Sequence, residues 1–421
     1  MFARPRPSPT RPRARLVRAG RPASTRGGRH RPGRTLAVLA VSVSMLAACG
    51  GSDGGSGLSS TTAYAPSSST VAPSSSASAA PRVEPAACGA RELAEMSPRR
   101  KLAQLLVVGV TGTQDAVDIV RREQIGGVFI GSWTDLGMLS DGGVASVQKA
   151  AETPVMVTVD QEGGRVSRLS GLGIDSPSAR ELAATMTVEQ VRALAKEQGL
   201  QMKELGITVD YAPVADVSDE SDDEVIGDRS FSDDPAVVTR YANAYAHGLQ
   251  DAGIMPVFKH FPGHGHGSGD SHTGTVATPD LDELQDSDLV PYRTLIQPGV
   301  AVMVGHLIVP GLTGPDTPAS ISEPAMSLLR DGTGYGGKPF DGPIFTDDLS
   351  GMAAISAKYG IEKAATLAIS AGADIALWLS TDKVPAVLDA LTAAMGSGTL
   401  PAQQVDESVV RVLRAKGELD C

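Results

Sequence analysis

Short apolar runs rich in β-branched residues recur from about residue 87 to the end of this chain. Such runs predict buried strands, and apolar residues at three- and four-residue spacing predict helices between them. The predicted strands are Leu105–Val110, Gly127–Ile130, Val155–Asp160, Thr208–Pro213, Met255–His260, Ala301–His306, Pro343–Asp347 and Asp374–Leu379. The clearest predicted helices are Asp115–Gln124, Val188–Leu205, Pro235–Ala252 and Ala353–Ala371.

The alternation of these strands and helices predicts the fold class. Strands that alternate with helices form parallel sheets, and about eight repeats close into a (β/α)8 barrel. We therefore predict an α/β fold with a single TIM barrel over residues 87–421, closed by an amphipathic helix at Val405–Lys416. An open doubly wound sheet is the alternative. The first strand is not followed by a GxGxxG turn, which disfavours a dinucleotide-binding form of that sheet.

The beginning of the chain has a different composition. Residues 1–34 contain eleven arginines and no acidic residue, and the apolar run 36–47 is too short to span a membrane. This pattern predicts a secretory signal peptide over residues 1–48. The LAAC motif at 46–49 resembles a bacterial lipobox, so we expect Cys49 to carry a lipid and to anchor the exported protein at the outer face of the cell membrane. An ordinary signal peptide with an incidental cysteine is the alternative.

Residues 49–86 are mostly Ser, Ala, Pro, Gly and Thr. A segment of this composition buries too little apolar surface to offset its chain entropy, so we predict a disordered tether. Two further cysteines, Cys88 and Cys421, stand at the two ends of the predicted barrel. An even pair in an exported protein suggests a disulfide, and two free thiols are the alternative. We expect a monomer that reaches the membrane through the lipid alone.

The charge of the chain narrows its partners. Without the eleven arginines of the signal, 26 of the 37 basic residues remain against 48 acidic ones, a net charge of −22. Such a surface repels phosphate backbones, so we expect no nucleic-acid partner.

Reactive side chains gather where the predicted strands end. In TIM barrels the working residues lie at the carboxyl ends of the strands. The third strand ends at Asp160, the fifth in Lys259-His260 and the seventh in Asp347-Asp348. Four of the seven histidines lie between positions 260 and 272. Because histidine titrates near neutral pH, this loop predicts acid–base catalysis.

The fifth-strand loop contains two further patterns. Asp270 and His272 are two residues apart, so in an extended loop they point to the same side, where the carboxylate would orient the imidazole. A solvated turn is the alternative. A metal site at His264 and His266 is disfavoured, because barrels with such a pair usually place it after the first strand. We expect no metal and no cofactor. Alternating glycines predict a flexible loop that closes over substrate: Gly263, Gly265, Gly267 and Gly269.

These motifs together resemble one family. The segment 259–265 (KHFPGHG), followed by DSH at 270–272, is similar to the signature of glycoside hydrolase family 3, and above all to its bacterial exo-β-N-acetylglucosaminidases. Other blocks are similar in the family order: 160–166 (DQEGGRV), 227–231 (GDRSF) and 345–349 (FTDDL). The resemblance covers roughly residues 95–415.

The resemblance implies a retaining, two-step hydrolysis that releases terminal N-acetylglucosamine. Asp347 would be the nucleophile and His272 the proton donor and then the base, with Asp270 tuning it, although most retaining glycosidases use two carboxylates. The residues that would hold the sugar are Asp160, Arg168, Arg229, Lys259 and His260. His264 and His306 would support the site. The expected carbohydrate substrates are N-acetylglucosamine-terminated cell-wall glycans, in particular peptidoglycan fragments.

Three other functions stay open on these residues. The chain could be a β-glycosidase or a glycoside phosphorylase of the same family, since a histidine would not repel a phosphate anion as a carboxylate does. It could also be an inactive sugar-binding lipoprotein on the same barrel. Asp347 and the Asp270–His272 pair are present, which disfavours the hypothesis of an inactive protein.

Overall fold

The computed structural model describes residues 88–421. The predicted signal peptide, Cys49 and the tether lie outside the described residues. The strands at the centre are β1 (Leu106–Gly109), β2 (Gly127–Ile130), β3 (Met156–Val159), β6 (Val209–Asp210), β7 (Met255–Phe261), β9 (Ala301–Val304), β11 (Ile344–Thr346) and β12 (Ala376–Trp378). These eight strands lie in parallel in the order β12-β1-β2-β3-β6-β7-β9-β11.

The sheet closes on itself at its two edge strands. A parallel bridge pairs Phe345 of β11 with Ile375 beside β12, and Thr346 donates its backbone N–H to the Ile375 carbonyl at 2.9 Å. Because closure leaves no free edge, every strand has a neighbour on each side. The predicted strands and the TIM barrel are therefore confirmed.

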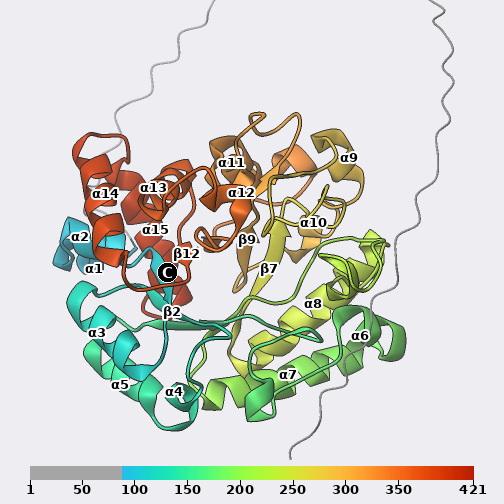
Figure 1. The fold of residues 1–421 in the computed structure, drawn as a ribbon, viewed down its shortest axis with the longest axis horizontal. Helices are drawn as coiled ribbons and strands as arrows, with labels where there is room; N and C mark the ends of the chain where they lie inside the picture. The colour runs from blue at the N-terminus through green and yellow to red at the C-terminus, as the bar shows by residue number, and fades with distance from the viewer. Residues whose placement is uncertain (1–87) are drawn as a thin grey trace, which may run out of the picture. The chain divides into compact units, whose positions relative to one another are not determined.

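Helices surround the strands on the outside of the barrel (Figure 1). The longer ones are α3 (Thr113–Glu123), α5 (Gly143–Ala150), α7 (Val188–Glu204), α8 (Pro235–Ala252), α11 (Glu323–Asp331), α13 (Ile361–Ala371), α14 (Val384–Gly396) and α15 (Ala402–Ala415). The shorter ones are α1 (Ala90–Glu95), α2 (Pro98–Ala103), α4 (Gly137–Ser140), α6 (Ala179–Thr185), α9 (Leu281–Asp286), α10 (Tyr292–Leu295) and α12 (Ala353–Ser356). Among residues 88–421, no helix combines the length and the apolar character that crossing a membrane requires.

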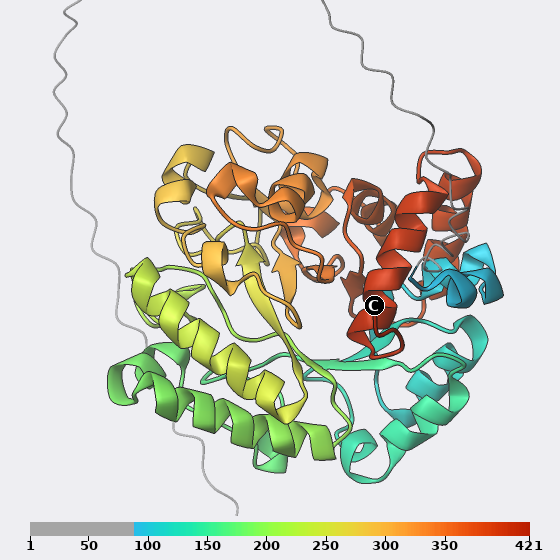
Figure 2. The same cartoon turned by 180° about the vertical axis from the view of Figure 1, so that it is seen from behind.

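The helices α7 and α8 lie side by side (Figure 2). Their backbones approach closely because two glycines face the contact. A Cβ on Gly248 would lie 2.4 Å from the Arg192 carbonyl oxygen, and one on Gly199 would lie 2.7 Å from the Ala252 Cβ. A larger residue at either position would push the helices apart.

One predicted helix is wrong in its extent. The sequence predicts a continuous helix over Ala353–Ala371, but the structure has α12 and α13 with a break at residues 357–360. Glycine has low helix propensity, and Gly360 adopts an extended conformation before α13. The first N–H groups of α12, which have no partner within the helix, are directed to another loop. Ala354 donates to the Ser271 carbonyl at 3.0 Å, which docks the loop after β7 on this helix.

The two ends of the described chain meet. Cys88 and Cys421 form a disulfide with their Cα atoms 5.9 Å apart. Nearby, α15 packs against α1 and α2 (Figure 2), and Lys101 pairs with Asp406 at 2.7 Å. The predicted C-terminal helix is present, and it buries Val405, Val409 and Leu413, whereas Val410 is only half-buried.

Candidate active site

A cavity of about 200 Å³ lies at the carboxyl ends of the strands. Its floor consists of buried residues of the barrel interior, including Phe129, Tyr211 and Met303. The cavity is lined by seven of the eight residues predicted for catalysis or sugar binding: Asp160, Arg168, Arg229, Lys259, His260, His272 and Asp347. The eighth, Asp270, is hydrogen bonded to His272. Folding thus brings together residues at the ends of β3, β7 and β11 and residues of the segments that follow β3, β6 and β7.

The two adjacent acids after β11 have different surroundings. Asp348 Oδ1 accepts hydrogen bonds from the Ser350 N–H and hydroxyl, both at 2.8 Å, and its Oδ2 accepts from the Gly351 N–H at 2.8 Å. Both oxygens of Asp348 therefore hold the following turn. Asp347 accepts only the Asp348 N–H, at 2.8 Å. Its role as the nucleophile stays a prediction, which these contacts support because they leave its carboxylate available to a substrate.

The pKa values of these two acids are shifted in opposite directions. Burial alone would raise the pKa of Asp347, but interaction with His260 and His306, the Asp348 N–H and the Lys259 ammonium together lower it. Burial raises the pKa of Asp348, and the neighbouring Asp347 charge adds to the increase. Asp347 is therefore the acid of this pair that is held ionised, as a nucleophile must be.

Asp270 and His272 form the pair that their spacing predicts. Asp270 Oδ1 accepts from the His272 backbone N–H at 2.8 Å and lies 2.8 Å from His272 Nδ1. Burial would raise the pKa of Asp270, but these two hydrogen bonds lower it. Because an ionised carboxylate only accepts, Nδ1 must carry the hydrogen, which leaves Nε2 to exchange a proton. The catalytic roles of the pair remain predictions.

Not all four glycines in the loop after β7 make that loop flexible. A Cβ on Gly263 would lie 2.3 Å from the Asp288 Cβ, and one on Gly265 only 1.9 Å from the Val217 carbonyl oxygen. These two glycines permit close packing at the base of the loop. Gly269, in contrast, has open space where a Cβ would stand. The prediction that all four glycines make the loop flexible is therefore wrong for Gly263 and Gly265.

Charged side chains from β7 and from the segments that follow β3 and β6 form a connected wall. Lys259 Nζ lies 2.5 Å from Asp160 Oδ1 and 2.5 Å from Glu162 Oε1. Arg229 makes a two-pronged contact with Glu162, with both N–O distances 2.8 Å, and Arg168 pairs with Asp160 at 3.6 Å. Burial would lower the pKa of Lys259, but Asp160 and Glu162 raise it, so the ammonium stays charged. Fixed donors beside an acceptor suit the hydroxyls of a sugar.

His260 is held by a buried acid that the sequence analysis missed. Asp216 Oδ2 lies 2.7 Å from His260 Nδ1, and its Oδ1 accepts the backbone N–H groups of His260 at 3.1 Å and of His264 at 2.8 Å. Burial would raise the pKa of Asp216, but the charge and hydrogen bond of His260 and the nearby His264 lower it to about 2. Asp216 therefore fixes the backbone and the ring of a predicted sugar-binding residue.

The remaining histidines of the mouth have separate partners. His306 Nε2 lies 2.8 Å from the Asp348 carbonyl oxygen, and its Nδ1 lies 2.6 Å from Ser320 Oγ. His264 is buried, and its pKa is lowered by burial and by the charge of His260. His266 Nδ1 lies 2.8 Å from Asp288 Oδ2. Within residues 88–421, no group of three or more His, Cys, Asp or Glu side chains is arranged to hold a metal ion.

Three residues of this site were not predicted from the sequence. Glu162 lies inside the DQEGGRV segment, two positions after Asp160, and an acid at that strand end was a usable signal. Asp216 follows the fourth predicted strand, where any acid is worth testing. Trp133 follows the second strand and lines the cavity. It packs on Phe129 and Gly131, which are near in sequence, but the cavity that it lines is formed with distant segments, so no local pattern identified it.

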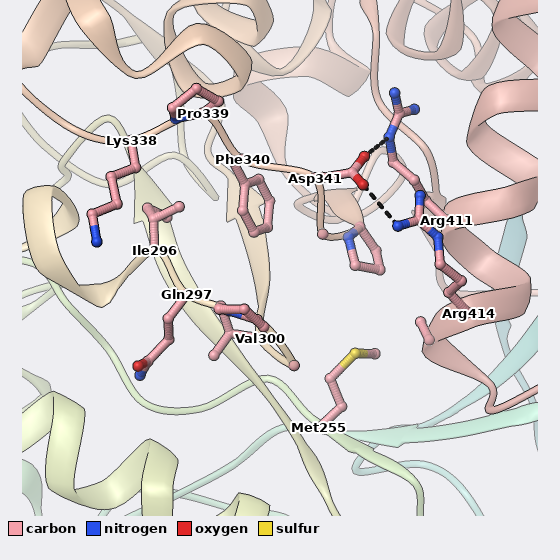
Figure 3. A pocket seen from close by; sticks show the side chains of 15 residues that line it. Met255, Ile296, Gln297, Val300, Lys338, Pro339, Phe340, Asp341, Arg411 and Arg414 are labelled. Carbon is pink, nitrogen blue, oxygen red and sulfur yellow. Dashed lines mark hydrogen bonds and ion pairs between the residues drawn. The ribbon is translucent and has the colours of Figure 1, made fainter. Parts of the chain in front are cut away.

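A larger cavity, of about 450 Å³, lies at the opposite end of the barrel (Figure 3). Met255 and Val300, near the beginnings of β7 and β9, contribute to it together with α15. Asp341 pairs there with Arg411 at 3.2 Å and with Arg414 at 2.7 Å. The amino-terminal face of a TIM barrel serves stability rather than chemistry, so we assign the active site to the smaller cavity.

The chain matches the family model of the Glycosyl hydrolase family 3 N terminal domain over residues 98–415. The beta-hexosaminidase LpqI of Mycobacterium tuberculosis (strain ATCC 25618 / H37Rv) is 56% identical over 387 residues, which cover 91% of this chain and 97% of that protein. A solved structure of M. tuberculosis LpqI is similar with a TM-score of 0.76 and 60% identity, and covers 77% of this chain and 95% of that one.

More distant relatives agree with this match. A structure of a glycoside hydrolase family 3 β-N-acetylglucosaminidase from Paenibacillus sp. str. FPU-7 is similar with a TM-score of 0.70 and 32% identity, and covers 77% of this chain and 62% of that one. The chain therefore belongs to glycosyl hydrolase family 3.

Asp216→Asn should destabilise the protein in a pH-dependent way. A carboxylate whose pKa is lowered by folding adds stability above its unfolded pKa, and loses that stability as the pH falls toward the folded value. Folding lowers the pKa of Asp216 from its ordinary 3.8 to about 2. This shift stabilises the folded protein by about 2 kcal/mol at neutral pH. In urea unfolding, the free energy of unfolding of the wild type should exceed that of Asp216→Asn by the full amount above about pH 5. The difference should decrease between about pH 4 and 2.

The matched control for this experiment is Asp316→Asn, because the Asp316 side chain is 91% exposed. It should leave the free energy of unfolding unchanged across the same pH range. A difference in free energy of unfolding between the wild type and Asp216→Asn that stays constant with pH would contradict the ionised, histidine-paired state of Asp216.

Proposed function

We propose that this protein releases terminal β-linked N-acetylglucosamine from glycans by a two-step, retaining mechanism. Membership of family 3 and its relatives that bear the name beta-hexosaminidase make it a glycoside hydrolase of the β-N-acetylhexosaminidase type. One observation carries the mechanism. Asp347, whose lowered pKa keeps it ionised, and His272, whose Nδ1 is held by Asp270, line the same cavity.

In the first step, the Asp347 carboxylate attacks the anomeric carbon, and the bond to the glycosidic oxygen breaks. His272 donates the Nε2 proton to that oxygen, so the aglycone leaves as a neutral alcohol. Asp270 stabilises the imidazolium before the transfer and keeps Nε2 as the reacting nitrogen. The product of this step is a glycosyl ester of Asp347.

In the second step, the neutral His272 takes a proton from water while the water oxygen attacks the anomeric carbon. The bond to Asp347 breaks, and the carboxylate is restored. The two substitutions at the same carbon retain its configuration. The charged wall of Asp160, Lys259 and Arg229 would hold the sugar hydroxyls throughout, because these groups are already fixed by one another.

The shape of the cavity supports action at chain ends. Its floor is closed by Phe129, Tyr211 and Met303, all buried, so a glycan can enter only from the mouth. We infer that a single terminal sugar occupies the depth of the cavity while the rest of the chain extends outward. Cell-wall glycans, in particular peptidoglycan fragments, are the substrates we propose, with the enzyme held at the outer face of the cell membrane by a lipid on Cys49.

Replacement of the nucleophile tests the function directly. Asp347→Ala should lower kcat/KM for nitrophenyl β-N-acetylglucosaminide by at least about 10³-fold, because no covalent intermediate can form. Asp348→Asn should lower it by less than about tenfold, because it perturbs only the turn. The wild type should hydrolyse the N-acetylglucosaminide far faster than the glucoside. Equal rates on the two sugars would refute the N-acetyl specificity, and an active Asp347→Ala variant would refute the nucleophile.

The proton donor is tested by the leaving group. Nitrophenolate leaves without a proton, whereas a sugar alcohol requires one. His272→Ala should therefore reduce the first chemical step much more for N,N′-diacetylchitobiose than for nitrophenyl β-N-acetylglucosaminide, as measured by single-turnover kinetics on both. An equal loss on both substrates would contradict the role of His272.

The lipid anchor is tested in the cell that makes the protein. Cys49→Ser should move the enzyme from the membrane fraction to the soluble fraction and abolish incorporation of a labelled fatty acid. Cys88→Ser is the control, because it keeps the LAAC motif. Unchanged membrane association of Cys49→Ser would contradict the anchor.

A further inference from the structure

Trp133 is the exposed aromatic side chain at the mouth of the active site. It lies just after β2 and is 42% exposed, although large apolar side chains in the described chain are otherwise mostly buried. Of the residues that line the cavity, only Trp133 and His272 are exposed, and the His272 side chain is 64% exposed. Both therefore lie at the outer rim, above the buried floor.

The indole is held in a fixed place. A Cβ on Gly131 would lie 2.4 Å from the indole ring, and one on Gly109 would lie 2.8 Å from it, so the ring packs directly on the backbone at the ends of β1 and β2. The Phe129 ring lies edge to face with the indole, and the two ring centroids are 6.0 Å apart. The turn itself is closed by Thr134, whose hydroxyl accepts the Gly131 N–H at 3.0 Å and donates to the Val110 carbonyl at 2.7 Å.

The cavity has a polar and an apolar half. The charged and imidazole groups come from the ends of β3 and β11, from β7 with its loop, and from the segment after β6 that carries Arg229. Around Trp133, on the side of β12, the lining is apolar, with Leu377 and Leu379. The polar half of the cavity can bind the hydroxyls of the terminal sugar, which lies deepest in the cavity. The apolar surface at the rim is then available to the aglycone, the part of the substrate that follows the terminal sugar.

The geometry points to Trp133 as the platform on which the aglycone sugar stacks, on the leaving-group side of the bond that is cleaved. Pyranose rings have apolar C–H faces that pack on flat aromatic rings, and a fixed, exposed indole loses little entropy when it binds one. The proposed proton donor His272 lines the same cavity and is likewise exposed, and it must reach the leaving oxygen. The inference rests on the proposed function, and it adds a preference for substrates whose aglycone is itself a sugar ring.

Kinetics of Trp133→Ala separate the two sides of the cleaved bond. For N,N′-diacetylchitobiose, kcat/KM should fall about five- to tenfold, with a smaller loss for Trp133→Phe. The inhibition constant of free N-acetylglucosamine should change by less than about twofold, because this sugar fills only the depth of the cavity. Leu200→Ala is the matched control, because Leu200 is an exposed apolar residue of α7 (46%) outside the site, and it should change neither value.

Fluorescence gives a second measurement that does not depend on turnover. The chain has two tryptophans, and Trp378 is only 1% exposed, so acrylamide quenching reports Trp133. In the full-length Asp347→Asn protein, N,N′-diacetylchitobiose should protect the emission from quenching, whereas N-acetylglucosamine alone should not. This experiment keeps the native indole, so it stands even where Trp133→Ala fails to fold.

Three outcomes decide the matter. An unchanged kcat/KM in Trp133→Ala would overturn the platform. Equal protection by the monosaccharide, or a parallel rise in its inhibition constant, would place the indole beside the released sugar and overturn the assignment to the aglycone. A wild-type protein that cleaves no N-acetylglucosaminide would instead refute the proposed function, and the quenching experiment would still report whether the disaccharide covers Trp133.

Discussion

The Lys259 ammonium is buried between two carboxylates, 2.5 Å from Asp160 Oδ1 and 2.5 Å from Glu162 Oε1. A buried charge is tolerated only when partners of opposite charge replace the water that it loses, and removal of one partner from such a pair costs about 3–5 kcal/mol. This interaction connects the end of β7 to the end of β3. It thus links, across β6, the ends of the two strands at which most of the predicted sugar-binding residues lie.

The same arrangement sets the electrostatics of the reaction. Glu162 and Asp160 hold Lys259 charged, and Lys259 contributes to lowering the pKa of Asp347 together with His260 and His306. Asp216 in turn holds His260. Lys259, Asp347 and Asp216 thus each have neighbours that favour their charged form. A preorganised site of this kind needs little rearrangement when the substrate enters, which is the main source of electrostatic catalysis.

The proposed acid–base residue, His272, is placed differently from the proposed nucleophile, Asp347. Asp347 follows a central strand directly, whereas His272 is exposed on a loop that is docked on α12 through the Ser271 and His272 carbonyls. A proton donor must reach the leaving oxygen at the mouth and later exchange with water, so an exposed loop suits it. The nucleophile must be shielded from water and held still, so the end of a strand suits it.

The sequence by itself determined the barrel and the residues near its mouth, because strand periodicity is local and TIM barrels collect the ends of their strands at one face. It predicted the eight strands, the amphipathic C-terminal helix and the Asp270–His272 pair, which is two residues apart. It predicted a continuous helix at Ala353–Ala371, because apolar spacing does not register the break that precedes the extended Gly360.

Only the tertiary structure decided which groups contact one another across the barrel. Glu162 acts through Arg229, which is 67 positions away, and Asp216 through His260, which is 44 positions away, so neither partnership leaves a mark in the local pattern. The different surroundings of Asp347 and Asp348 depend on the turn at Ser350 and Gly351 and on the charges packed around them. Charge states and contacts depend on distances in space, and those distances are set only when the strands close into a barrel.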